Sequence, residues 1–104
     1  MKKAKKSKIN ELIDYQVKSV VSKEVLKGKT GSVTLFAFDK GQGLSEHTAP
    51  FDALVYIFDG EAKITLSGLA HLLTSGETIL MPANKPHSLK AIKPFKMMLI
   101  MIRS

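Results

Sequence analysis

The sequence predicts an all-β domain, either a sandwich or a barrel. Short runs of β-branched and aromatic residues recur along the chain, and in residues 61–66 the apolar positions alternate cleanly with polar ones. Asp59-Gly60, between two apolar runs, predicts a hairpin, and Ser67-Gly68 marks another tight turn. Many short strands separated by tight turns, with no convincing helix after the N-terminal stretch, are typical of sandwiches and barrels.

The individual elements follow in chain order. Residues 1–8 are rich in lysine and predict a disordered basic tail, after which residues 9–104 form a single domain. Apolar residues between Ile9 and Val17 lie at helical spacing and predict a short helical or extended segment. The valines and the leucine in residues 20–26 favour a strand. Further strands are predicted at residues 32–38, 53–58, 61–66, 70–73, 78–81, 87–92 and 95–102.

The amino-acid composition indicates in which cellular compartment the protein is expected. The 104 residues are 44% hydrophobic and include no cysteine, so a disulfide or a thiolate zinc site is excluded and the cytoplasm is the expected compartment. The longest apolar runs have six residues, far short of the roughly 18 that a membrane helix needs. The lysine-rich start leads into no apolar stretch, so no secretory signal is expected.

The net charge of +7 is concentrated at the N-terminus. Five of the sixteen basic residues lie in residues 1–8, which leaves eleven against nine acidic residues elsewhere. A terminal lysine cluster is typical of a solvated tail, whereas nucleic-acid binding calls for a basic face on folded structure. We therefore expect neither a nucleic acid nor a membrane as a partner.

Two spacings of glycine, proline and histidine discriminate among β folds. Residues 41–60 begin with glycine, five residues and His47, and end with a glycine. Residues 76–87 read glycine, five residues, proline, four residues and His87, and fifteen residues separate the two stretches. Both spacings resemble the two sequence motifs of the cupin family over about residues 30–102. The amino-acid sequence of these two stretches also resembles that of a subgroup of small bacterial single-domain cupins, most of them without an assigned function.

The resemblance implies a jelly-roll β-barrel of two antiparallel sheets with a pocket at its open end. In metal-binding cupins the first motif supplies two histidines and a glutamate, and the second supplies one more histidine. His47 matches the first histidine of that set and His87 the last. Ala49 stands at the position of the second histidine and Ala53 at that of the glutamate. The resemblance therefore implies a degenerate metal site.

The residues themselves support the same expectation. His87 alternates with Ser88 and Lys90 and shares a face with Leu89, so it should point into the barrel. Two imidazoles alone hold zinc weakly, because catalytic zinc takes three protein ligands and a water. We expect no cofactor; should His47 and His87 hold an ion, nickel, zinc, iron or manganese is expected. The predicted ligand pocket consists of His47, His87, Met81 and Tyr56.

Several other residues have plainer interpretations. His71 lies between the two motifs and is expected to be a packing or surface residue. Four methionines, Met81, Met97, Met98 and Met101, are expected in the core, the alternative being that they line a cavity for an apolar ligand. No catalytic residue is identified, since no nucleophile elbow, phosphate loop or triad is present.

Three functions remain open from the sequence. The first is a barrel that binds a small organic molecule, with His47 and His87 as its polar groups. The alternative is a metal-dependent cupin enzyme, such as a dioxygenase, isomerase or decarboxylase, that uses a two-histidine site. The third is a structural or interaction protein with a vestigial pocket.

The chain is also expected to form a homodimer. In residues 32–38, Phe36 and Phe38 occupy one strand face while Val33 and Leu35 occupy the other, so neither face is polar. A small barrel has one interior, so the second apolar face needs another cover. The N-terminal segment is expected to supply part of that cover and a symmetric partner the rest.

Overall fold

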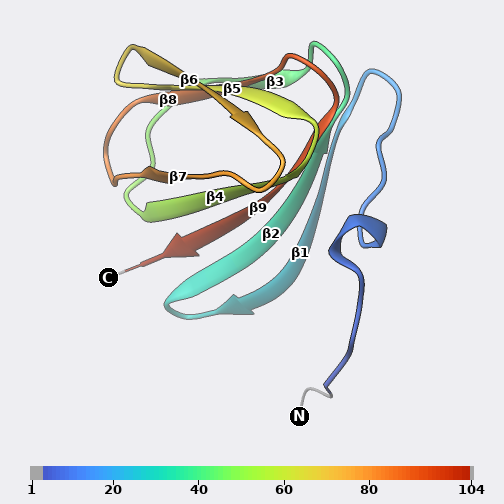
Figure 1. Ribbon diagram of the computed structural model, residues 1–104. Coiled ribbons are helices and arrows are strands. Elements are labelled where there is room, and N and C mark those ends of the chain that lie inside the picture. Colours follow the sequence, from blue (N-terminus) through green and yellow to red (C-terminus); the bar gives the residue numbers. More distant parts are fainter. Residues whose placement is uncertain (1–3, 104) are drawn as a thin grey trace.

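The structure is a computed structural model that describes residues 4–103, and it confirms the predicted fold class (Figure 1). Its nine strands form two antiparallel sheets that face each other. In order, the elements are the 3-10 turn η1 (Ile9–Glu11) and the strands β1 (Val20–Gly28), β2 (Gly31–Phe38), β3 (Gly43–His47), β4 (Asp52–Asp59), β5 (Glu61–Leu66), β6 (Leu69–Thr74), β7 (Thr78–Met81), β8 (His87–Ala91) and β9 (Phe95–Ile102).

The strand order in each sheet is that of a jelly roll rather than a simple meander. One sheet has five strands in the order β1-β2-β9-β4-β7, and the other has four in the order β3-β8-β5-β6. Between residues 4 and 103 the single helical element is η1, and no helix there is long and apolar enough to cross a membrane. The expected helical or extended N-terminal segment is thus one 3-10 turn followed by extended chain.

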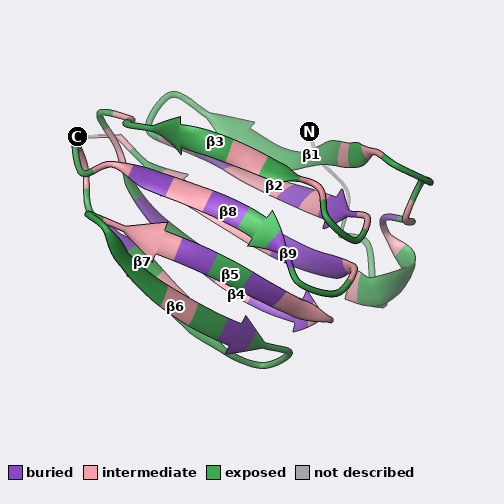
Figure 2. Cartoon of the chain, turned by 90° about the horizontal axis from the view of Figure 1, so that it is seen from above, coloured by how far each residue is buried: buried purple, intermediate pink, exposed green. Residues whose placement is uncertain are grey.

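The core lies between the two sheets and fills the barrel. Phe38 of β2 and Phe95 of β9 stack with ring centroids 4.4 Å apart, and neither side chain is accessible to solvent. Alternate residues of β5 and β8 face the same interior, which gives both strands the alternating burial visible in Figure 2. This two-residue period is the alternation that predicted the strands from the sequence.

The predicted Asp59-Gly60 hairpin is wrong. β4 and β5 belong to different sheets, so the dipeptide forms a corner where the chain crosses from one sheet to the other. Gly60 has φ +79°, and an added Cβ there would lie 1.8 Å from the carbonyl oxygen of Pro94. Glycine is needed at this position for both its conformation and its lack of a side chain. The Ser67-Gly68 turn, in contrast, does join the paired strands β5 and β6.

Strand β3 was not among the predicted strands. It pairs with β8, Leu44 opposite Leu89 and His47 opposite His87. Three residue steps on β3 therefore match two steps on β8, which makes a β-bulge. The extra residue reverses the alternation, and His47 comes to the same face of the sheet as Leu44.

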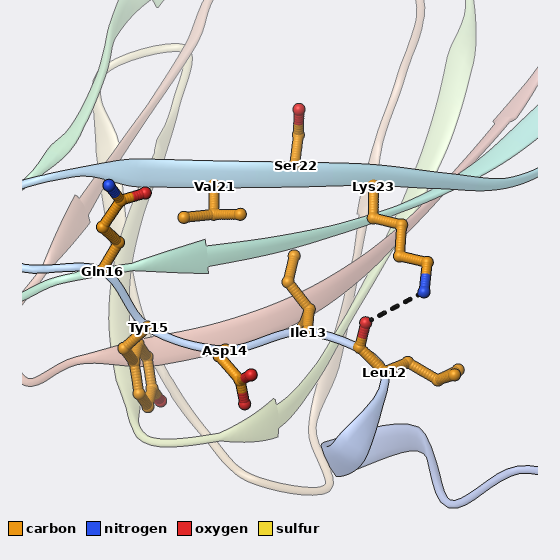
Figure 3. A pocket seen from close by; sticks show the side chains of 8 residues that line it. All are labelled: Leu12, Ile13, Asp14, Tyr15, Gln16, Val21, Ser22 and Lys23. Atoms are coloured by element: carbon orange, nitrogen blue, oxygen red, sulfur yellow. Dashed lines mark hydrogen bonds between the residues drawn. The ribbon is translucent and has the colours of Figure 1, made fainter.

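The outer face of the five-stranded sheet is apolar, and residues 9–16 cover part of it; we call this segment the N-terminal strap. Ile13 is 5% exposed and packs in a cluster with Leu35, Ala37 and Phe58. The strap runs beside β1, where the Nζ of Lys23 donates a hydrogen bond to the Leu12 carbonyl at 3.3 Å (Figure 3). The expected partial cover of this face by the N-terminal segment is confirmed.

The predicted basic tail precedes the strap. Its residues 1–3 lie outside the described part of the chain. Its residues 4–8 are exposed and belong to no helix or strand.

Candidate functional site

The structure brings His47 and His87 together at one end of the barrel. They are cross-strand neighbours on β3 and β8, and their Nε2 atoms lie 2.9 Å apart. The two rings meet edge to face, with centroids 4.2 Å apart and planes inclined by 69°. The contact brings two groups 40 residues apart in the chain within reach of one shared proton, ion or ligand atom.

The other ring nitrogen of each histidine, Nδ1, contacts the backbone carbonyl oxygen of the residue two positions earlier in the chain. The Nδ1 of His47 lies 2.8 Å from the carbonyl oxygen of Ser45, and the Nδ1 of His87 lies 3.2 Å from that of Lys85. A carbonyl oxygen only accepts, so each Nδ1 carries the hydrogen and donates it. The 2.9 Å hydrogen bond between the two Nε2 atoms needs one hydrogen between them, so one ring carries a hydrogen on its Nε2 and the Nε2 of the other accepts it.

The two imidazoles differ in exposure. His47 is exposed, whereas His87 is only 7% exposed. Burial lowers the pKa of His87 below its ordinary value; the hydrogen bond to the Lys85 carbonyl partly opposes the shift, and His47 adds to it. Burial thus favours the neutral form of the His87 ring, while the His47 ring remains in contact with solvent.

Two loops carry the site, and backbone contacts join them. The β3–β4 loop begins at His47, and the β7–β8 loop ends at His87. The amide of Asn84 donates to the carbonyl of Ala49 at 2.8 Å, and the amide of Ala83 donates to the Asp52 carboxylate at 2.8 Å. These hydrogen bonds fix the position of one loop against the other and so the separation of the histidines.

The remaining ligand positions of metal-binding cupins do not fit a divalent ion. Ala53 lies in the interior of the barrel with a side chain that offers no donor, and Ala49 lies in the loop. Asp52, next to Ala53, uses its carboxylate on the Ala83 amide. Within residues 4–103 no group of three or more histidine, cysteine, aspartate or glutamate side chains could hold a metal ion. Zinc needs at least three such ligands.

The four residues of the predicted pocket do not all meet. Met81 lies inside the barrel, 4% exposed, directly opposite Ala53 on β4. Tyr56 lies on the other face of β4 and packs in the Ile13 cluster beneath the strap. Its placement follows from the register, since Tyr56 is an odd number of residues from Ala53. The expected contribution of Tyr56 to a pocket with the histidines is not supported.

Two grooves on the surface are lined by residues other than the histidines. One groove of about 530 Å³ runs between the strap and β1 and is lined by Ile13, Tyr15 and Val21, among others (Figure 3). Another, of about 580 Å³, lies on the outer face near Leu26 and Ile100.

Of the four methionines expected in the core, Met81, Met97 and Met101 lie in it or pack against it, whereas Met98 does not. Met101 packs against the interior and pairs with Ala53, so Ala53 has a methionine on either side, Met101 and Met81. Alternation along β9 from Phe95 agrees with the inner position of Met101. Met98, one position off that alternation, packs with the outer cluster. His71 is half-buried on β6, opposite Ile64.

Comparison with known proteins agrees with the fold and the motifs. The family model of the cupin domain, Cupin_2, matches residues 34–103. No curated protein matches the sequence.

Solved structures of similar chains come from several bacteria. A conserved protein of unknown function from Streptococcus pyogenes is 31% identical with a TM-score of 0.93, over 100% of this chain and 91% of that one. A cupin superfamily protein from Desulfitobacterium hafniense is 26% identical with a TM-score of 0.92, over 100% of this chain and 95% of the other.

A third similar structure belongs to a longer chain. A cupin 2 conserved barrel domain protein from Leptotrichia buccalis is 37% identical with a TM-score of 0.87, over 90% of this chain but only 46% of that chain. The family match, the motif spacing and the two-sheet barrel all agree, and this chain belongs to the cupin family.

Proposed function

We propose that this cupin binds a small organic molecule at the open end of its barrel, with His47 and His87 as the polar groups that hold it. The observation that carries the proposal is the convergence of two imidazole Nε2 atoms at 2.9 Å, each ring oriented by a backbone carbonyl. Fixing a polar group before the ligand arrives lowers the entropic cost of binding.

The surroundings favour a ligand with an acidic hydrogen and an apolar body. An O–H or N–H group of the ligand would donate to the lone pair of an Nε2 atom. The apolar side chains behind the histidines belong to Leu66, which is His87's neighbour on β5, and to Leu69 beyond it, which is 65% exposed. Such a combination of a few polar groups and apolar walls is typical of small-molecule sites.

Native mass spectrometry of the untagged protein tests this proposal. We expect a small-molecule adduct on the wild-type chain that is absent from the His47→Ala/His87→Ala variant. His71→Ala is the matched control, because His71 is a half-buried histidine of the same four-stranded sheet but lies on β6. An adduct that survives the double substitution would show that the ligand binds elsewhere.

A metal-dependent cupin enzyme is the second candidate, because two adjacent Nε2 atoms also suit a cation. Against it, residues 4–103 offer no third histidine or carboxylate to a nickel, zinc, iron or manganese ion at this place. Metal analysis of the untagged protein separates the two candidates. Stoichiometric divalent metal would favour the enzyme.

We also propose that the protein forms a homodimer through the outer face of the five-stranded sheet. Beside the strap, one cross-strand row of aliphatic residues spans all five strands and is left partly or largely exposed. This aliphatic row consists of Leu26, Val33, Ile100, Leu54 and Leu80, each the direct register partner of the next. A second copy of the same neutral row is a chemically matched cover for it.

The size of the row limits the strength of the dimer. Five strands about 4.8 Å apart make a face roughly 20 Å wide, and the bare part is only a few residues deep. Stable interfaces bury about 800 Å² from each partner, so we propose a dimer that dissociates on dilution. The absence of cysteine from the sequence supports the proposal that this assembly works in the cytoplasm.

A further inference from the structure

The contacts of the two imidazoles determine how many hydrogens their ring nitrogens carry. Each Nδ1 atom meets a backbone carbonyl oxygen, at 2.8 Å for His47 and at 3.2 Å for His87, and a carbonyl oxygen only accepts. The Nε2 atoms lie 2.9 Å apart, so one of them donates to the other. Together these contacts need three hydrogens on the four ring nitrogens.

Three hydrogens give the histidine pair one positive charge. A neutral imidazole carries one hydrogen, so two neutral rings supply only two, and one of the contacts would then join two acceptors. Two charged rings supply four, and two donors would then face each other across the 2.9 Å between the Nε2 atoms. Only a pair made of one charged and one neutral ring satisfies every contact.

The burial of the two rings indicates which of them is charged. His87 is 7% exposed, and its register partner on β5 is the apolar Leu66. Burial disfavours a charged imidazole. His47 is exposed at the end of β3, where water solvates an imidazolium. His47 is therefore the charged ring, which donates from its Nε2, and His87 is the neutral ring, which accepts.

The charged groups around the pair leave its charge available to a ligand. Glu46 precedes His47 on β3, and Asp52 accepts a hydrogen bond from the Ala83 amide. Within residues 4–103 neither carboxylate forms a hydrogen bond or ion pair with a histidine ring. Lys85, whose carbonyl oxygen contacts His87, adds a further positive charge to the β7–β8 loop.

We propose that His47 and His87 form an imidazolium–imidazole pair that shares one hydrogen, and that the ligand of this site is an organic anion with a carboxylate group. The inference rests on the proposed function and specifies the charge of the ligand. Where the pair holds only two hydrogens, a carboxylic acid supplies the third. Its O–H bond breaks, an N–H bond forms at the Nε2 of His47, and the electron pair stays on the carboxylate oxygen.

The hydrogen count can be measured by nitrogen-15 NMR of the imidazole rings in ligand-free protein at about pH 6. Two independent histidines with an ordinary pKa of about 6.5 would both be largely charged there, with hydrogens on all their ring nitrogens. We expect hydrogens on both nitrogens of His47 but only on the Nδ1 of His87. His71→Asn is the control and should leave this pattern unchanged, because His71 lies on β6. Any other distribution over the two rings would overturn the assignment.

The charge of the ligand can be tested with benzoate and with benzamide, a neutral molecule of nearly the same shape. Stepwise addition of each probe, followed by the ring resonances of both histidines, should show that benzoate binds about tenfold more tightly. His47→Asn should abolish this preference, and His71→Asn should keep it. Absence of a preference in the wild type would overturn the anionic ligand. The hydrogen count uses no ligand, so its failure is distinct from the absence of a small-molecule adduct in mass spectrometry.

Discussion

Lys96 of β9 donates hydrogen bonds to both the backbone and the side-chain oxygen of Asn10, each at 2.9 Å. The lysine is only 6% exposed, and its ammonium group lies 5.1 Å from the ring centre of Tyr15. Tyr15 in turn donates its hydroxyl hydrogen to the carboxylate of Asp59. The strap is thus held by partly buried polar contacts on either side of Ile13, in addition to apolar packing.

Deletions of different length should separate the tail from the strap. Removing residues 1–8 should leave the melting temperature almost unchanged, because residues 4–8 are exposed. Removing residues 1–16 also removes Ile13 and both polar contacts, and exposes the apolar outer cluster. We expect a large loss of thermal stability and aggregation in that variant. Equal melting temperatures for the two deletions would show that the strap contributes nothing.

Ile13→Ala tests the apolar part of the strap alone. The side chain is 5% exposed against Leu35 and Ala37, so its truncation should cost about 2–3 kcal/mol of unfolding free energy. Val17→Ala is the control, because Val17 is 80% exposed and should change stability little. Urea unfolding of both variants measures the difference. A similar cost at both positions would contradict the packing of Ile13.

Tyr15 predicts a loss of stability at high pH. Burial, reinforced by the hydrogen bond and the charge of Asp59, raises the pKa of Tyr15 well above its ordinary value. The folded state therefore keeps the phenol protonated at a pH where the unfolded chain ionises. This stabilisation is complete below about pH 10 and is lost as the pH rises above that value.

Comparison with Tyr15→Phe isolates this effect from the titration of the lysines. Between pH 8 and pH 11 the unfolding free energy of the wild type should fall more steeply than that of the variant. In the folded protein, the tyrosinate absorbance of Tyr15 should appear only at a pH higher than that at which an ordinary tyrosine ionises. A Tyr15 that titrates in the usual range would show that its contact with Asp59 does not persist in solution.

Two glycines with nearly equal φ values should respond differently to alanine. Gly68 has φ +82° and no atom within 4 Å of an added Cβ, so Gly68→Ala should cost only the backbone strain, about 1–2 kcal/mol. Gly60→Ala adds a collision with the Pro94 carbonyl and should cost at least ~2 kcal/mol more. Thermal unfolding measures both. Equal losses would mean that the Gly60 corner yields to a side chain.

Leu54→Lys should weaken the proposed dimer. Leu54 lies at the fourth position of the aliphatic row and is 38% exposed, so a lysine would bring two like charges together at the interface. Leu72→Lys is the control, because Leu72 is exposed on β6 of the other sheet. Light scattering should give a mass near twice 11.4 kDa for the wild type and the control. A wild type that stays monomeric at high micromolar concentration would refute the dimer.

The sequence predicted the strands that have a clear apolar pattern. It did not predict features that depend on which strands pair and in which register. Residues 61–66 have a regular two-residue pattern and residues 97–102 form a continuous apolar run, and both stretches lie in strands. β3 begins at a glycine and includes a bulge, so its short segment has no clear alternation. The Asp59-Gly60 corner has the amino-acid composition of a hairpin turn. It is not one, because the flanking strands β4 and β5 pair with other strands and not with each other.

The candidate site shows the same division. Motif spacing identified His47 and His87, but their direct contact depends on the bulge in β3. Tyr56 was assigned to the pocket although it lies an odd number of residues from Ala53, and the position of Met101 beside Ala53 depends on the pairing of β4 with β9. Cross-strand neighbours are set by tertiary structure, and a single sequence does not specify them.

The irregular pairing of β1 with β2 between Glu24 and Leu26 has a consequence for how copies of the protein meet. β1 is the longest strand at an edge of either sheet, and such an edge could recruit a strand from another molecule into an endless ribbon. The bulge twists this edge, and Lys23 and Lys27 place charge along it. Both features disfavour ribbon growth from β1, which agrees with the proposed contact of two copies through their sheet faces.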